Sequence, residues 1–277
     1  MYVLQPYSML GTPFSISPNP ATLFLTPSLK AALHKVRRTI DNRQGLSCIL
    51  GDAGMGKSSV LRYLYGAYES ESGVTAAFVT EPEISSPYAF VKSLCQVFKV
   101  SPRRSLLDQK NALKEFIFTE AEEGRNVVLL LDEAQGLDSA MLEIVRSFLN
   151  YETNNAKLLQ IVMAGQLELR NRLKLKSNRA LKSRIIMYSL LDPLSLSETK
   201  AMLRHRCEMV EIEVPFPDEV VQLIYDAAGG VPRDILRFCD GAFELAQFVG
   251  EKTVTAVMAQ SIIDRESQIM SDEVEVV

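Results

Sequence analysis

The sequence predicts an α/β fold in which a three-layer domain with a parallel sheet is followed by a small all-helical lid domain. The first observation is a set of short apolar runs without alternation, at 47–50, 127–131 and 158–164. Such runs are typical of parallel strands covered on both faces. The second observation is that helical periodicity fills the intervals between the runs. The third is that strand patterns stop near residue 192, after which only helical segments follow.

Local patterns predict the elements of the α/β part in order. Residues 47–50 are bounded by Gly51, which indicates a buried strand that enters a tight loop. Asp138 can act as a helix N-cap, and the apolar residues after it predict a helix that runs to about Leu149. Because strands and helices alternate, crossover connections are expected. The remaining expected elements are strands at 74–79, 127–131 and 158–164 and helices at 59–68, 88–98 and 111–122.

The C-terminal part is predicted to be helical throughout. Ser195 and Glu198 form an S-x-x-E capping box, a pattern that starts a helix. Helices are expected at 202–210, between Asp218 and Gly229, at 233–249 and at 255–265. The chain is therefore expected to contain an α/β domain with its N-terminal segment at 1–191, a helical lid domain at 192–266 and an acidic mobile tail at 267–277.

The composition favours a protein that folds without covalent staples. Of the 277 residues, 47% are hydrophobic, which is enough for a full core. The four cysteines form no C-x-x-C pair, so neither a disulfide framework nor a zinc ribbon is predicted. The apolar run at 127–131 is far shorter than the ~20 residues of a membrane helix, and the N-terminus lacks the pattern of a secretion signal. We therefore expect a cytoplasmic protein that does not bind a membrane.

The charge is unevenly distributed along the chain. A formal net charge of −4 and a pI of about 5.4 argue against a uniformly basic nucleic-acid binder. Seven cations and no acid nevertheless lie between Arg170 and Arg184. Both a solvated helix face and a contact surface are compatible with such a run. The two histidines lie in arginine-rich helical segments, where we expect surface residues and no metal site.

Residues 51–58, GDAGMGKS, match the phosphate-binding pattern G-x-x-x-x-G-K-[ST] at every fixed position. The glycines let backbone N–H groups surround phosphates, and the following helix adds the positive end of its dipole. Lys57 is expected to reach the β- and γ-phosphates and the Ser58 hydroxyl to bind Mg²⁺. The sequence therefore predicts a site for ATP with Mg²⁺. The expected contacts come from Asp52, Ala53, Gly54, Met55, Gly56, Lys57, Ser58 and Ser59.

Two carboxylates follow the apolar run at 127–131 directly. Asp132 and Glu133 are thereby placed at the carboxyl end of a parallel strand, the edge at which open α/β sheets bind ligands. This is a Walker B pattern, in which Asp132 holds the Mg²⁺ shell and Glu133 polarises the attacking water as a general base. The alternative, that both acids only cap the next turn, is weakened by the phosphate-binding loop.

With these motifs, the chain resembles a known family over about residues 10–265. It is similar to the ExeA/GspA-type AAA+ ATPases and, more broadly, to the transposition ATPases typified by TniB, TnsC and MuB. The phosphate-binding loop alone indicates only an NTPase, and the other stretches are more specific. These stretches are Pro13-Phe14-Ser15 through Leu25-Thr26-Pro27-Ser28, Leu131-Asp132-Glu133-Ala134-Gln135, residues 159–166 with Glu168-Leu169-Arg170, and Gly230-Val231-Pro232-Arg233.

The resemblance implies further roles for individual residues. Gln166 lies where the family has sensor 1, which orients the attacking water, although it could simply cap its strand. Arg184 lies where the family presents an arginine finger to the γ-phosphate of the neighbouring subunit, with Arg179 as the reserve candidate and surface solvation as the alternative. Arg233 resembles sensor 2. Phe14 and its neighbours resemble the family's N-terminal segment, which packs near the adenine. Packing in the core alone explains Phe14 equally well.

The combined features predict an Mg²⁺-dependent ATPase that forms a homo-oligomer, either a closed ring or a helical filament. Secretion members of the family carry a membrane segment and a peptidoglycan-binding region, and these 277 residues contain neither. A stand-alone ATPase of this length resembles those encoded beside DDE transposases. This resemblance implies a transposition regulator that assembles with ATP on double-stranded DNA, without sequence readout, marks the target and stimulates a transposase or works with a targeting protein. Lys99, Arg103 and Arg104 are candidates for a pore loop, with surface solvation as the alternative.

Two other functions remain open from the sequence. The first is a cytosolic accessory ATPase that acts on protein partners in secretion or assembly. The second is an ATP-dependent scaffold with little turnover, in which assembly itself is the function.

Overall fold

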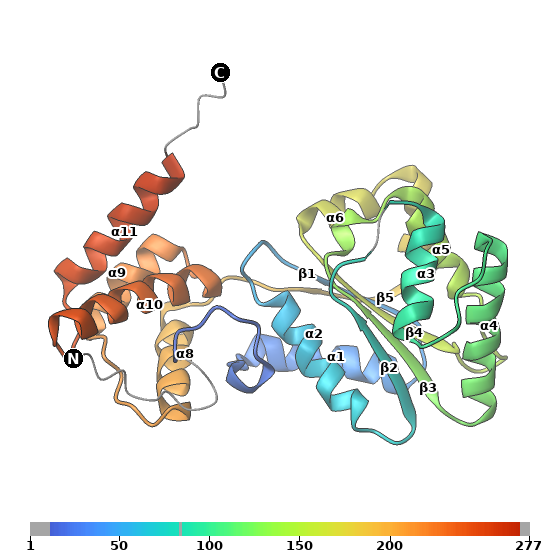
Figure 1. Ribbon diagram of the computed structural model, residues 1–277, viewed down its shortest axis with the longest axis horizontal. Coiled ribbons are helices and arrows are strands. Elements are labelled where there is room, and N and C mark those ends of the chain that lie inside the picture. The colour runs from blue at the N-terminus through green and yellow to red at the C-terminus, as the bar shows by residue number, and fades with distance from the viewer. Residues whose placement is uncertain (1–11, 83–84, 272–277) are drawn as a thin grey trace. The chain divides into compact units, whose positions relative to one another are not determined.

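The computed structural model describes residues 12–82 and 85–271 of the chain (Figure 1). Its contacts divide the chain into two compact units. The α/β unit comprises residues 25–53 and 57–191, and the helical unit comprises residues 1–24, 54–56 and 192–277, so far as these are described.

A five-stranded, fully parallel sheet forms the centre of the α/β unit. Its strands lie in the order β2-β3-β4-β1-β5. Their bounds are β1 (Leu46–Leu50), β2 (Val74–Val79), β3 (Asn126–Leu131), β4 (Leu159–Gly165) and β5 (Ile185–Leu190). Every residue of β1, β3 and β4 is buried, as expected for central strands without hydrophobic alternation. The predicted fold class is confirmed.

Strand β5 was not among the strands predicted from sequence. It pairs with β1 at the edge of the sheet, with an irregularity in register between Leu46 and Ser47. Only Ile185 is buried, and Ile186, Tyr188 and Leu190 are exposed. The strand therefore lacks the continuous burial of the central strands. Its backbone pairs with β1, a contact that no local pattern in the sequence predicts.

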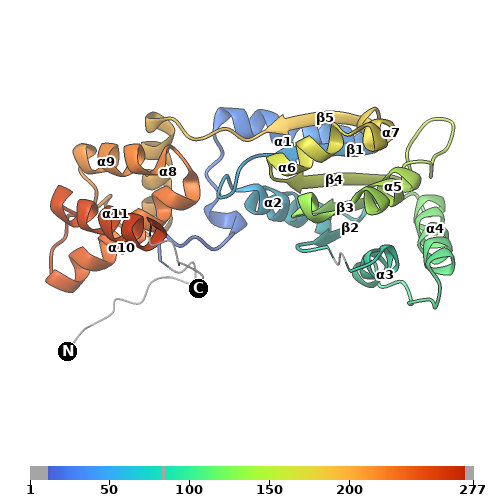
Figure 2. The same ribbon diagram turned by 90° about the horizontal axis from the view of Figure 1, so that it is seen from above.

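Helices cover both faces of the sheet (Figures 1 and 2). On one face, α1 (Pro27–Asp41) and α2 (Lys57–Glu69) pack on a core that contains Ile49, Val128 and Val162. The other face carries α3 (Pro87–Val97), α4 (Leu106–Glu122), α5 (Ser139–Phe148), α6 (Leu167–Leu173) and α7 (Arg179–Lys182). Asp138 caps α5 as predicted, because its carboxylate accepts from the Met141 N–H at 2.8 Å.

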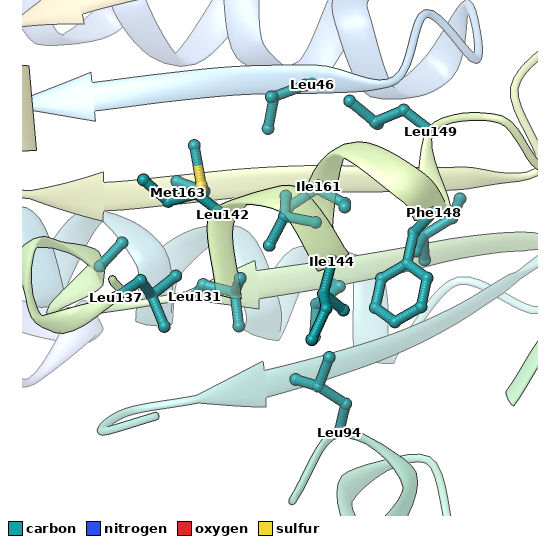
Figure 3. Packing of buried hydrophobic residues seen from close by; sticks show 14 of the residues in the cluster. Leu46, Leu94, Leu131, Leu137, Leu142, Ile144, Phe148, Leu149, Ile161 and Met163 are labelled. Carbon is teal, nitrogen blue, oxygen red and sulfur yellow. The ribbon is translucent and has the colours of Figure 1, made fainter. Parts of the chain in front are cut away.

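On the face that carries α3 to α7, one hydrophobic core contains residues of the sheet and of these helices. Figure 3 shows Leu131, Ile161 and Met163 of the central strands against Leu142 and Phe148 of α5. All five side chains are buried. Burial of each such side chain contributes roughly 1.5–3 kcal/mol, so this interface holds the carboxyl ends of β3 and β4 in a defined place.

The helical unit has its own hydrophobic core. It contains α8 (Leu196–Met209), α9 (Asp218–Ala228), α10 (Pro232–Val249), α11 (Ala256–Ser271) and the short 3-10 helix η1 (Pro20–Thr22). The predicted capping box is confirmed, since Ser195 and Glu198 make both of its hydrogen bonds at the start of α8. Gly229 ends α9 with left-handed backbone, φ 58°. Helix α11 continues past Arg265, where its end was predicted, to Ser271.

In the part of the chain that the structure describes, we find no helix long and apolar enough to cross a membrane.

Gln160 on β4 supports a prediction about stability. Its side chain is fully buried, accepts from the Gly45 N–H at 2.8 Å and donates to the Lys157 carbonyl at 2.8 Å. Gln160→Met would leave both backbone groups without these partners, at about 1–3 kcal/mol each. We expect urea unfolding to show a loss of about 2–6 kcal/mol in the free energy of unfolding.

The matched control is Gln222→Met, because Gln222 is exposed on α9 and bonds only across one helical turn to Asp226. A change within about 0.5 kcal/mol is expected there. Equal losses in the two variants would show that the buried amide does not carry the predicted contribution.

Candidate active site

The phosphate-binding loop connects the end of β1, at Leu50, with the start of α2, at Lys57. Gly54 and Gly56 have φ values of 80° and 84°, in a region that favours glycine, so the loop depends on residues without a Cβ. The Lys57 side chain is buried, and its ammonium donates to the carbonyls of Gly51 at 2.9 Å and Asp52 at 2.7 Å. The loop and the helix start expected from the pattern are thus both present.

The other predicted loop contacts differ in exposure. Asp52 and Ala53 are exposed, Met55 is buried, and Gly54, Gly56, Ser58 and Ser59 are half-buried.

Asp132 follows β3 and lies at the same edge of the sheet as the loop. Its side chain is only 3% exposed, and one carboxylate oxygen accepts from the Glu133 N–H at 3.0 Å. Burial raises the pKa of Asp132, and a side-chain hydrogen bond with Ser58 acts in the opposite direction. The structure therefore brings together the two predicted Mg²⁺ ligands, Ser58 and Asp132.

The residues at this edge fit ATP with Mg²⁺. A carboxylate and a hydroxyl are the hard oxygen donors that Mg²⁺ prefers, and the cation usually completes its shell with water and phosphate oxygens. Within the described residues, no group of three or more His, Cys, Asp or Glu side chains could hold a metal ion by itself.

Glu133 has unusual backbone geometry. Its φ and ψ are 49° and 33°, the left-handed region that residues with a side chain seldom adopt. A 3-10 turn, η2 (Ala134–Gly136), follows at once, and the Gly136 N–H donates to the Glu133 carbonyl at 3.0 Å. The Glu133 carboxylate is half-buried and accepts a hydrogen bond from the side chain of Gln135.

Gln166 follows β4 and is the N-cap residue of α6. Its side chain makes no hydrogen bond that caps this helix. Its backbone N–H donates to the side-chain oxygen of Gln135 at 3.1 Å. Gln135 therefore contacts both Glu133 and Gln166. No local pattern indicates a role for Gln135, because Gln166 lies 31 positions away and becomes its neighbour only in the folded chain.

Arg184 precedes β5, is half-buried and hydrogen-bonds within the α/β unit. Its guanidinium donates to the Arg146 carbonyl at 3.1 Å and to the Asn150 side-chain oxygen at 2.6 Å. Since β1 and β5 are parallel, Arg184 lies at the amino ends of these strands, whereas the phosphate-binding loop lies at their carboxyl ends. The structure thus does not bring Arg184 to this chain's own loop. Arg179, the reserve candidate, is exposed at the start of α7.

Arg233 and Phe14 belong to the helical unit. Arg233 is exposed in the first turn of α10, and its backbone N–H donates to the Gly54 carbonyl at 3.2 Å, a contact within this unit. Phe14 is fully buried and makes edge contacts with Phe216 and Phe243, at ring-centre distances of 5.1 and 5.3 Å. For Phe14, the structure favours the core-packing alternative over a role beside the adenine.

The cationic segment between Arg170 and Arg184 does not act as one surface. Arg172 donates to the Leu137 carbonyl at 2.6 Å, so this cation and Arg184 are bound internally. Arg170, Lys174 and Lys182 line a pocket of about 290 Å³ whose other lining residues are Leu50, Leu173, Tyr188, Ser189 and Leu190. The sequence alone could not separate the internally bonded cations from those at the pocket.

Two hydrogen bonds hold the backbone of the loop that contains Lys99, Arg103 and Arg104. The Tyr88 hydroxyl donates to the Arg103 carbonyl at 2.6 Å, and the Arg103 N–H donates to the Gln109 side chain at 2.7 Å. All three cationic residues are exposed. These contacts hold the backbone of the loop at Arg103. The pore contact stays a prediction.

Comparison with known proteins agrees with this architecture. Residues 39–173 match the family model described as "AAA domain". Two solved structures align with 94% of the chain: Cdc6p from Pyrobaculum aerophilum, with a TM-score of 0.69, and the Aeropyrum pernix ORC1 protein in complex with DNA, with a TM-score of 0.70. Their sequence identity is 17% in each case, and the chain covers 74% and 69% of them. The α/β unit has the AAA fold.

A curated relative extends the similarity beyond the AAA domain. The General secretion pathway protein A of Aeromonas hydrophila is 30% identical over 244 residues. The match covers 86% of this chain and 44% of the relative. The chain therefore spans less than half the length of that protein, and the match includes residues outside the 39–173 segment.

Proposed function

We propose that this chain is an Mg²⁺-dependent ATPase. The observation that supports this proposal most strongly is the carboxyl end of the sheet, where the phosphate-binding loop leads into Ser58 and where Asp132 and Glu133 follow β3 directly. This arrangement combines phosphate binding, metal ligation and a general base. The AAA fold and the match of residues 39–173 to the AAA domain model support the same chemistry.

Each group has a distinct role in this proposal. Backbone N–H groups of residues 52–59 and the Lys57 ammonium hold the phosphates, and Ser58 and Asp132 hold the cation. When bound, Mg²⁺ neutralises charge on the β- and γ-phosphate oxygens. Glu133 accepts a proton from the attacking water, and Gln166 orients that water. Arg233 is proposed as the sensor 2 residue, the role that the family resemblance implies for it.

Assembly would complete the site if Arg184 reaches the γ-phosphate of a neighbouring subunit. An arginine supplied in this way stabilises charge in the transition state and contributes about 10³-fold or more to turnover. Arg184→Ala is therefore expected to lower ATP turnover about 10³-fold without abolishing ATP binding. Arg179→Ala, measured in parallel, tests the reserve candidate.

Mixing two inactive variants tests action between subunits. When Arg184→Ala is mixed with Glu133→Gln, some interfaces combine an intact Glu133 with an intact Arg184, so activity is expected to return in part. Because Arg184 also bonds to Arg146 and Asn150, thermal unfolding must show that the variant remains folded. Full activity of Arg184→Ala alone would contradict the assignment, and loss in Arg179→Ala with recovery on mixing would transfer it to Arg179.

The process driven by the ATPase has two candidates. The similarity to General secretion pathway protein A favours an accessory ATPase that acts on protein partners in secretion or assembly. The structural similarity to an ORC1 protein solved in complex with DNA favours the second candidate, an ATP-dependent oligomer on DNA of the kind expected for a transposition regulator. Phosphate contacts in such an oligomer would require no sequence readout.

Duplex DNA of random sequence separates these candidates. Binding would be measured with ATP, with ADP and without nucleotide across a salt series, while electron microscopy records rings or filaments. Cooperative binding only with ATP, falling steeply with salt, would support the DNA-based function. Intact ATPase activity without DNA binding under any condition would eliminate it and leave the protein-directed function.

A further inference from the structure

Gln135 links the ends of two neighbouring strands through one side chain. Its amide nitrogen donates to a carboxylate oxygen of Glu133, directly after β3, and its amide oxygen accepts from the Gln166 N–H, directly after β4, at 3.1 Å. Strands β3 and β4 are adjacent in the sheet. The proposed general base is therefore connected by two hydrogen bonds to the strand end that carries Gln166.

The local backbone makes this connection possible. Left-handed geometry at Glu133 turns the chain as it leaves β3, and the 3-10 turn that follows brings residue 135 back toward residue 133. Left-handed backbone at a residue with a side chain costs of order 1–3 kcal/mol and persists only where the surroundings hold it. Here the surroundings include the amide of Gln135, which holds the Glu133 side chain.

The amide at position 135 has the chemistry that both contacts need. Only a side chain with both a donor and an acceptor can donate to a carboxylate and accept from a backbone N–H at once. The space beside the amide is also limited, because a Cβ added at Gly165 would lie 3.0 Å from the Gln135 oxygen and 2.8 Å from Leu169 Cδ2. A residue with a larger side chain at 165 would displace one of these neighbours.

We propose that Gln135 is a positioning residue for hydrolysis. By donating to one oxygen of the Glu133 carboxylate, it fixes the plane of that group and leaves the second oxygen directed for proton acceptance from water. By accepting from Gln166, it ties this orientation to β4, so that the base and the water-orienting residue keep a constant separation. This inference rests on the proposed role of Glu133 as general base.

The test uses Gln135→Met, which keeps the length of the side chain and removes both hydrogen-bonding groups. We expect kcat to fall about tenfold, with KM and the Kd for a fluorescent ATP analogue unchanged, since Gln135 lies outside the phosphate-binding loop. Gln135→Glu keeps the size and the acceptor oxygens but loses the donor, and it should show a loss of at least the same size. Thermal unfolding establishes that each variant is folded.

A double-mutant cycle distinguishes positioning from a general structural effect. In the Glu133→Gln background, single-turnover rates with excess protein should show no further loss on adding Gln135→Met, because the amide then has no base to orient. The control is Gln160→Met. Gln160 is a buried amide near the start of β4, whereas Gln166 follows the end of that strand. This substitution should lower stability and leave kcat per folded molecule unchanged.

Three results would overturn the inference. These are an unchanged kcat in Gln135→Met, a loss of nucleotide affinity equal to the loss of kcat, and a full additional loss in the Glu133→Gln background. The proposed function fails in a different way, namely when Glu133→Gln alone hydrolyses ATP at the rate of the parent. The two failures can therefore be told apart in one set of measurements.

Discussion

ATP turnover in the Glu133→Gln variant is expected to fall by about 10²–10⁴-fold, the range typical for removal of a general base. Glutamine keeps the size of the side chain but cannot accept a proton from water at neutral pH. Binding of ATP should persist, because the phosphate-binding loop and the pair Ser58 and Asp132 are unchanged. Phosphate release under saturating ATP measures turnover, and equilibrium titration with a fluorescent analogue measures binding.

Glu122→Gln is the matched control for this experiment. Glu122 is exposed at the end of α4, on a helix that carries no proposed catalytic group, so its turnover should equal that of the parent. An unchanged rate in Glu133→Gln would remove the catalytic assignment. Very low turnover in the parent itself, with ATP-dependent assembly intact, would instead support the scaffold alternative.

Lys57→Met is expected to weaken ATP binding about 10- to 100-fold, because charge-assisted hydrogen bonds contribute about 1.5–3 kcal/mol each. The buried ammonium now donates to the carbonyls of Gly51 and Asp52, which places it inside the loop that surrounds the phosphates. Methionine fills similar space without the charge. Isothermal titration with ATP and Mg²⁺ measures the change in Kd.

The control for Lys57 is Lys35→Met on α1, where the lysine is exposed. Its Kd for ATP should not change. Because Lys57 also satisfies two loop carbonyls, the unfolding temperature of Lys57→Met must be recorded. An unchanged Kd in a folded Lys57→Met protein would show that the loop does not bind phosphate as proposed.

Most of the sheet could be predicted because its central strands carry continuous apolar runs. The runs at 127–131 and 158–164 appear in the structure as β3 and β4 with every residue buried. Parallel strands also share one carboxyl edge, so the positions of Asp132 and of the phosphate-binding loop followed from the order of elements. The predicted caps at Asp138 and Ser195 are confirmed because capping depends on residues only three apart.

Edge pairing and long-range contacts could not be predicted in the same way. Strand β5 has one buried residue and exists as an edge strand beside β1, which lies far away in the sequence. The partners of Arg184 and the burial of Phe14 among Phe216 and Phe243 likewise depend on residues distant along the chain. The local sequence at these positions does not distinguish a side chain that contacts the protein from one that is exposed to solvent.

The sequence by itself determined the chemistry that depends on contiguous residues: the glycine-rich loop with Lys57 and Ser58, and the acidic pair Asp132 and Glu133 after a buried strand. Only the tertiary structure decided which side chains meet across strands. Gln135 lies between Glu133 and Gln166 because the register of β3 against β4 and the left-handed turn at Glu133 bring together residues 31 positions apart. Local motifs contain the groups that react, whereas strand register and packing determine their orientation.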